Sequence, residues 1–178
     1  MAVFMEMATT LRHNRLIRTL SSEIIEFERR NEAYALSEEG TLVYWGNRKE
    51  PDFIKLVNIE EIEDVDRFKQ ITINDLYYVQ SDFFMFKKNK YLYNERETRI
   101  AGQPDLIVEI WSEDNTEFGR KTKLDLYSSS PVTEHWYAEQ DSNEVICYLG
   151  RDRLENQYLT DVLVTRDGLR FDLRYLAL

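Results

Sequence analysis

The chain has 178 residues, of which 43% are hydrophobic, and its 33 acidic and 23 basic side chains give a net charge of −10. This length and hydrophobic share favour one globular domain over residues 1–178 and exclude a disordered chain. The negative charge argues against non-specific nucleic-acid binding through the whole surface, although basic side chains gather locally.

Cysteine content and apolar runs bear on the compartment. Cys147 is the single cysteine, so an internal disulfide is excluded, which fits a reducing cytoplasm. No apolar run reaches the roughly 18–20 residues that a membrane span needs, and the start "MAVFMEMATT" lacks the basic region of a signal peptide. We therefore expect a cytoplasmic protein without a membrane partner.

The first half of the chain predicts a helix followed by short strands. Apolar residues at helical spacing predict a helix over residues 10–31. "AYALSEEGTLVYW" then gives two β-like runs around a turn at Glu39–Gly40. Residues 46–76 are charged and mixed in periodicity, and we interpret them as a variable insertion with strands near 53–57 and 71–73. The aromatic run "LYYVQSDFFMF" predicts one strand.

The second half predicts a strand, a helix and then further strands. A polar, basic connection over residues 87–102 leads to a strand at Asp105–Trp111. Asn115 or Thr116 would cap a helix over residues 115–129. The strand candidates "HWYAE", "EVICYLG" and "QYLTDVLV" follow, and a later "DG" predicts a hairpin into "LRFDLRYL". This order indicates an α/β or α+β domain with one mixed sheet flanked by helices.

A carboxylate interrupts the apolar strand "LIVEIW". An unpaired ionised Glu109 would cost several kcal/mol if both faces of this strand were buried. Asp82 begins the preceding strong apolar run, so antiparallel pairing would set Asp82 and Glu109 abreast, roughly 5 Å apart at Cβ. Two carboxylates at that distance repel, and a hard divalent ion, Mg²⁺ or Mn²⁺, resolves the conflict. The backbone carbonyl of Ile110 would supply a third ligand.

The following helix supplies cationic side chains. Arg120, Lys123 and Tyr127 share one helix face, and the short connection after Glu109 lets this helix pack over the strand end. Lys123 would then reach a metal-bound water, with Arg120 and Tyr127 as supporting residues around it. The implied chemistry is metal-assisted phosphodiester hydrolysis, in which the ion activates water and Lys123 stabilises charge.

Each of these residues also has a purely structural interpretation. Asp82 would be a turn residue that starts a strand, Glu109 a half-buried partner of Arg120 in a salt bridge, and Lys123 an exposed helix lysine. Asp105 shares the strand face of Glu109, so it is either a neighbour of the acidic pair or only a strand-start residue. Spacing alone leaves these alternatives open.

Four blocks of the chain occur in a recognisable order, in the run "VQSDFFMF … AGQPDLIVEIWS … GRKTKLDLYSSSPVTEHWYAEQDSNEVICYLG". This run resembles the Uma-type family of restriction endonucleases, and the resemblance covers residues from about 10 to 150. It implies a restriction-endonuclease-like fold of the PD-(D/E)xK nuclease superfamily and a Mg²⁺- or Mn²⁺-dependent endonuclease that hydrolyses DNA. It also implies that Asp82 and Glu109 are the metal-binding acids, and that the superfamily's lysine has moved onto the helix as Lys123.

Some positions depart from this resemblance or imitate it. Ser81 stands where the family usually has proline, and Trp111 stands where other PD-(D/E)xK enzymes carry lysine, so activity would depend on Lys123. "PDFIK" at 51–55 imitates the superfamily motif, but we interpret it as a loop that leads into a strand. His13 and His135 are too few and too separated for a zinc site, and we expect His135 to pack in a strand beside Trp136.

Two other function classes stay open. The net charge and the acidic run over residues 60–66 would suit a catalytically silent domain that binds a partner or assembles on the same fold. A small-molecule enzyme with unrelated chemistry has no positive support in the chain. Because 23 aromatic residues exceed what one small core needs, we also expect a homodimer.

Overall fold

The structure is a computed structural model of the whole chain. The residues that it describes are 11–30, 34–38, 40–46, 54–62, 76–94, 99–111, 115–139, 142–172 and 174. The strand expected near 71–73, most of the expected insertion and the second half of the acidic run at 60–66 therefore lie outside the described residues, as does the side chain of His13.

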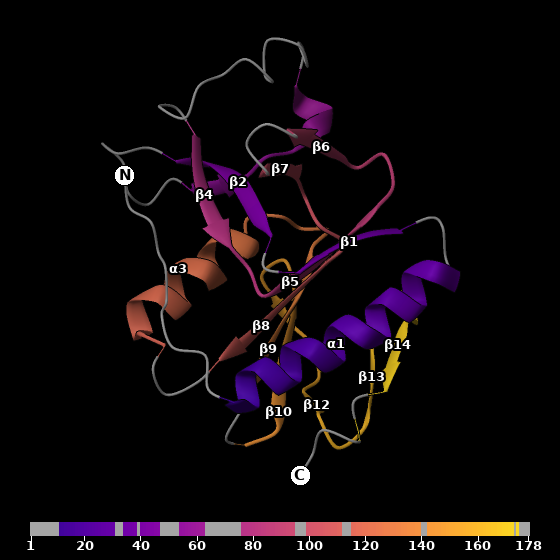
Figure 1. Cartoon of the computed structure of the whole chain (residues 1–178). Helices are drawn as coiled ribbons and strands as arrows, with labels where there is room; N and C mark the ends of the chain where they lie inside the picture. Colours follow the sequence, from indigo (N-terminus) through magenta and orange to yellow (C-terminus); the bar gives the residue numbers. More distant parts are fainter. Residues whose placement is uncertain are drawn as a thin grey trace.

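The main sheet is mixed, with strands in the order β1-β5-β8-β9-β10-β11, and β12 pairs with β10 at its edge (Figure 1). Strands β8 and β9 are parallel, whereas the other neighbours in this sheet are antiparallel. These strands are β1 (Tyr34–Glu38), β5 (Phe83–Lys87), β8 (Leu106–Trp111), β9 (Glu134–Glu139), β10 (Glu144–Leu149), β11 (Asp152–Arg153) and β12 (Gln157–Tyr158).

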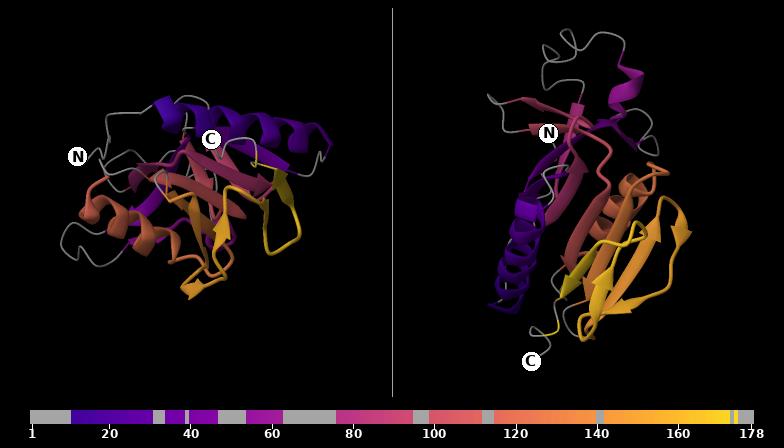
Figure 2. Two further views of the ribbon diagram at one scale, coloured as in Figure 1. Left: turned by 90° about the horizontal axis from the view of Figure 1, so that it is seen from below. Right: turned by 90° about the vertical axis from the view of Figure 1, so that its right-hand side faces the viewer.

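Helices α1 (Leu11–Arg30) and α3 (Glu117–Tyr127) cover opposite faces of this sheet (Figure 2). Both were expected, and the Thr116 side chain caps α3 by accepting a hydrogen bond from the Gly119 N–H. Successive residues of β8 point to opposite faces, so Val108 packs with Leu16 of α1, whereas Ile107 packs with the residues of α3. Glu109 has the parity of Ile107 and therefore faces α3.

A second, five-stranded sheet has the order β3-β2-β7-β6, with β4 beside β2. It contacts the end of α3, where the Leu56 N–H donates to Ser129 Oγ at 3.0 Å. Its strands are β2 (Thr41–Gly46), β3 (Ile54–Leu56), β4 (Leu76–Gln80), β6 (Tyr91–Asn94) and β7 (Arg99–Gly102), and the 3-10 helix η1 spans Ile59–Glu61.

This second sheet corrects three expectations. A single mixed sheet was expected, but the described strands form two larger sheets and a hairpin. The run "LYYVQSDFFMF" is two strands rather than one, because the chain leaves one sheet and enters the other at Ser81–Asp82. The connection over residues 87–102 contains β6 and β7, which at four residues each are too short to give a clear periodic signal.

A hairpin of β13 (Val162–Val164) and β14 (Arg170–Asp172) follows the main sheet. The expected "DG" turn is present, with Gly168 at φ 82°, but "QYLTDVLV" is split between β12 and β13. Glu134 ties the hairpin to the sheet because its carboxylate accepts from Trp136 Nε1 at 2.7 Å and from the Arg166 N–H at 2.8 Å.

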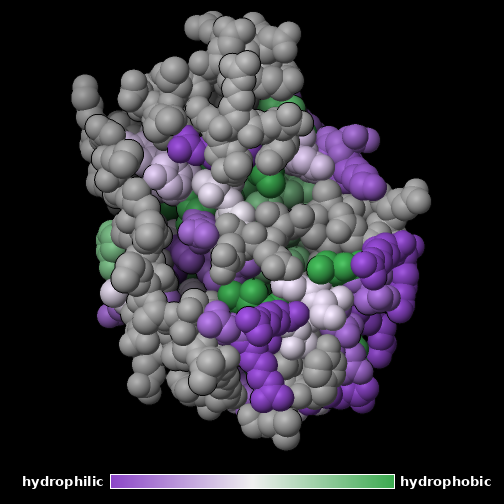
Figure 3. Space-filling view, viewed as in Figure 1, coloured by the Kyte–Doolittle hydropathy of each residue, from purple (hydrophilic) through white to green (hydrophobic). Residues whose placement is uncertain are grey.

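The outer surface agrees with a water-facing α1. Figure 3 shows mainly hydrophilic side chains over this helix, and Arg15, Arg18 and Arg29 are exposed on it. Among the described helices, none is long and apolar enough to cross a membrane.

Candidate active site

The register of β5 and β8 places Asp82 beside Glu109. Phe83 lies opposite Val108 and Phe84 opposite Ile107, and one further step of this antiparallel register brings Asp82 opposite Glu109. The Ile110 N–H donates to Asp82 Oδ2 at 2.7 Å, which fixes the Asp82 carboxylate at the end of the paired segment. The antiparallel pairing assumed from the sequence is therefore present, and Asp82 lies close enough to Glu109 for its charge to raise the pKa of that carboxyl.

Glu109 is held from α3 by two side chains one turn apart. Lys123 Nζ lies 2.7 Å from Glu109 Oε2, and the Tyr127 hydroxyl donates to Glu109 Oε1 at 2.5 Å. Residues at i and i+4 share a helix face, so one helix delivers both donors. The Glu109 residue is only 1% exposed, which makes this a buried, charge-assisted network.

Opposing effects act on the pKa of Glu109. Burial raises it most and the nearby Asp82 carboxylate adds to the rise, whereas the charge and hydrogen bond of Lys123 and the Tyr127 hydroxyl lower it, with a resulting pKa of about 7. Burial and the neighbouring Glu109 raise the pKa of Tyr127 well above its usual value. Tyr127 therefore stays protonated and acts as a donor to Glu109.

Arg120 is not the cation that neutralises Glu109. Its Nη1 lies 2.8 Å from Glu139 Oε1, and its guanidinium carbon lies 4.7 Å from the centre of the Trp111 ring. Lys123, and not Arg120, forms the salt bridge to Glu109 that the structural interpretation expected. Lys123 is also half-buried, whereas that interpretation made it an exposed helix lysine. Trp111 is thus a platform for a cation beside the site.

Asp105 is not brought to the acidic pair. It shares the strand face of Glu109, but four residues of extended strand separate the two by about 13 Å. Its Oδ2 accepts from the Lys87 N–H at 2.7 Å, and its Oδ1 lies 3.6 Å from Lys90 Nζ. Asp105 therefore closes the opposite end of β8, in agreement with the strand-start alternative.

The residues at the site fit a hard divalent cation. Asp82 and Glu109 supply carboxylate oxygens, which are the ligands that Mg²⁺ and Mn²⁺ prefer. Within the described part of the chain no group of three or more His, Cys, Asp or Glu side chains could hold a metal. An ion between Asp82 and Glu109 would therefore need backbone oxygen and water as well, and the Ile110 carbonyl remains the expected third ligand.

Two buried side chains of β9 that were not predicted to belong to the site lie next to it, since Tyr137 is beside Glu109 and His135 contacts Tyr137. The parallel register sets Tyr137 beside Glu109 and His135 beside Ile107. Burial lowers the pKa of His135 to about 4, so the ring is neutral. His135 Nε2 lies 2.8 Å from the Gly150 carbonyl and must donate to it, which leaves Nδ1, 2.9 Å away, to accept from the Tyr137 hydroxyl. The sequence signal that could have revealed this contact is the alternation in "HWY", which places His135 and Tyr137 on the same strand face.

Replacing Tyr127 with Phe should lower the free energy of unfolding by about 1.5–3 kcal/mol, because a buried hydrogen bond to a charged group is lost. Urea unfolding at pH 8 measures this loss. Tyr158→Phe is the matched control, since Tyr158 is 47% exposed and its change should leave stability within about 0.5 kcal/mol. Equal stabilities of the two variants would show that the Tyr127 hydroxyl does not support Glu109.

Comparisons with known proteins agree with this fold. No curated protein matches the chain. Over 97% of this chain and 85% of the other, the structure is similar, at a TM-score of 0.61 and 14% identity, to the crystal structure of "a putative nuclease belonging to DUF820" from Anabaena variabilis. Residues 65–174 match the model of the Uma2 family, described as "Putative restriction endonuclease". Because that match spans more than half of the chain, this protein belongs to the Uma2 family, and its fold is nuclease-like as expected.

Proposed function

We propose that this protein is a metal-dependent endonuclease that hydrolyses DNA phosphodiester bonds. The observation that carries the proposal is that Asp82, just before β5, lies close to Glu109 of β8, and that Lys123 of α3 contacts Glu109. Membership of a family described as "Putative restriction endonuclease" supports it, as does the fold shared with a structure described as "a putative nuclease".

In this proposal Asp82 and Glu109, with the Ile110 carbonyl, hold Mg²⁺ or Mn²⁺. The ion, when bound, lowers the pKa of a water molecule and neutralises charge on the phosphate. Lys123 places its ammonium group beside the reacting phosphate, where it stabilises developing negative charge and orients the attacking water. Tyr127 keeps the Glu109 carboxylate in one orientation through its hydrogen bond.

Cleavage of supercoiled plasmid DNA tests the proposal. We expect nicked or linear products with Mg²⁺ or Mn²⁺ and none in EDTA. Glu109→Gln and Lys123→Met should each lose about 100-fold or more in rate, as happens when one charge-stabilising group is removed from an active site. Asp152→Asn, at an exposed carboxylate on β11, is the control. Wild-type rates in both site variants would refute the nuclease assignment.

A catalytically silent domain is the second candidate, and one observation favours it. Lys123 and Tyr127 each contact one Glu109 oxygen, so the buried carboxylate is satisfied without an ion. Calorimetric titration with Mn²⁺ separates the two candidates. A nuclease should show binding that Glu109→Gln removes, whereas a silent domain should give the same small heat in both proteins.

The expected assembly and compartment remain proposals. We propose a homodimer in the cytoplasm, on the basis of the aromatic content and the single cysteine. Sedimentation that shows only monomer at micromolar concentration would remove the dimer.

A further inference from the structure

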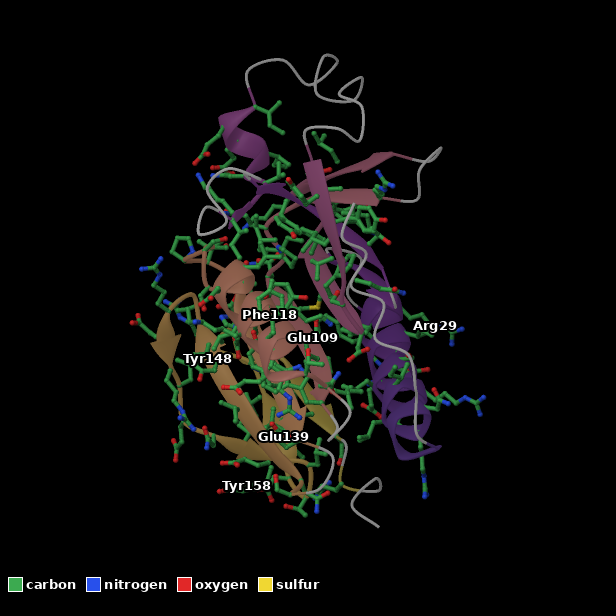
Figure 4. All side chains as sticks on the ribbon, turned by 90° about the vertical axis from the view of Figure 1, so that its left-hand side faces the viewer. Arg29, Glu109, Phe118, Glu139, Tyr148 and Tyr158 are labelled. Atoms are coloured by element: carbon green, nitrogen blue, oxygen red, sulfur yellow. The ribbon has the colours of Figure 1, made fainter. Side chains whose placement is uncertain are left out.

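A second cation lies beside the candidate active site. Arg120 precedes Lys123 by three residues on α3, so the two side chains leave the same side of the helix about 5–6 Å apart at Cβ. Trp111 follows Glu109 by two residues and shares its strand face, and Trp111 lies in register with Glu139 of β9. The Trp111–Arg120–Glu139 cluster therefore lies two residues of β8 beyond Glu109, toward the end of that strand. Figure 4 shows Glu109 and Glu139 along this side of the sheet, next to α3.

The guanidinium of Arg120 is fixed before any ligand arrives. Its carbon lies 4.7 Å from the centre of the Trp111 ring, and that ring packs against Tyr137 with centroids 4.1 Å apart. Arg120 is 26% exposed and Glu139 24%, so solvent reaches the pair. Such a planar, permanently charged and stacked group suits phosphate recognition, because little conformational entropy is lost on binding.

The position of Arg120 matches a neighbouring phosphate rather than the reacting one. Two residues of extended strand, about 7 Å, separate Trp111, the platform of Arg120, from Glu109, the partner of Lys123. Lys123 contacts Glu109 directly, whereas Arg120 contacts Glu139. Lys123 is therefore placed for the reacting phosphate, and Arg120 for the next phosphate along the strand.

We propose that Arg120 binds the DNA phosphate that flanks the hydrolysed one, with Trp111 as its platform. Glu139 is then the anion that Arg120 exchanges for the phosphate. This inference rests on the proposed function for the identity of the substrate. The competing explanation is that the Arg120–Glu139 pair only fastens α3 to β9.

Salt-dependent binding of a labelled DNA duplex, followed by fluorescence anisotropy in EDTA so that nothing is cleaved, separates the two explanations. Arg120→Gln should weaken binding about tenfold, through loss of one charged hydrogen-bond partner, and should reduce the slope of log K against log salt by about 0.9. Glu139→Gln should strengthen binding, because it removes the competing carboxylate. A fastening role predicts instead that both variants weaken binding to the same degree.

The controls keep this test separate from that of the nuclease. Lys121→Gln changes the charge equally at an exposed neighbouring position of α3 and should alter affinity less than twofold. If Arg120 governs affinity and salt slope but the wild type cleaves nothing with Mn²⁺, the nuclease proposal fails and the phosphate contact stands. If the wild type cleaves DNA and Arg120→Gln keeps affinity and slope, the phosphate contact is refuted. It is also refuted if Glu139→Gln weakens binding, or if the wild type shows no binding at low salt.

Discussion

Replacing Lys123 with Met should lower the free energy of unfolding by about 3–5 kcal/mol at pH 8.5, which is the usual cost of removing one partner from a buried ion pair. Glu109 is 1% exposed and its cationic partner is Lys123 Nζ at 2.7 Å. Without that cation the carboxylate must stay buried and charged or take up a proton. The loss should therefore be smaller at pH 6, where protonation of Glu109 is easier because its pKa is already raised to about 7.

The matched control for this prediction is the double variant Glu109→Gln with Lys123→Met. It removes both charges, and the side-chain amide introduced by Glu109→Gln can still accept from the Tyr127 hydroxyl, so most of the lost stability should return. Urea unfolding of the four proteins at both pH values gives the coupling energy of the pair. Additive losses in this cycle would mean that Lys123 does not neutralise Glu109 in solution.

Two buried groups should give opposite pH dependences of stability in metal-free protein. Burial lowers the pKa of His135 from 6.5 to about 4, so its contribution is fully present above pH 6.5 and is lost as the pH falls toward 4. The pKa of Glu109 is raised from 4.5 to about 7, so its contribution is fully present below pH 4.5 and is lost as the pH rises through 7. Each shift corresponds to about 3 kcal/mol, and in the wild type the two nearly cancel.

Glu109→Gln should reveal the pH dependence that His135 contributes to the free energy of unfolding. The stability of this variant should rise by about 3 kcal/mol between pH 4 and 6.5, relative to the pH profile of the wild type. His135→Gln should show the reverse trend, because the contribution of Glu109 is then no longer opposed by that of His135. Chemical denaturation in EDTA at half-unit steps of pH measures both profiles. Parallel profiles for wild type and Glu109→Gln would show that Glu109 has an ordinary pKa.

Local sequence patterns predicted much of the fold and part of the site. The helical spacing of α1, the Thr116 cap of α3 and the apolar run of β8 are properties of short segments, so they could be read without the rest of the chain. The approach of Asp82 to Glu109 followed from one added assumption, antiparallel pairing of neighbouring strands. The two-sheet arrangement could not be predicted in this way, since the polar break "QSD" within "LYYVQSDFFMF" does not encode which sheet each half joins.

The sequence by itself determined which residue types are available at the end of β8: two acids, and a lysine and a tyrosine one helical turn apart. The tertiary structure alone decided which charge meets which. The parallel register of β8 and β9 brings Glu139 and Tyr137 to this place from a segment far along the chain, and the packing of α3 gives Lys123 rather than Arg120 to Glu109. Charges act over a few ångströms of space, and that distance depends on strand register and helix packing, which spacing along the chain does not encode.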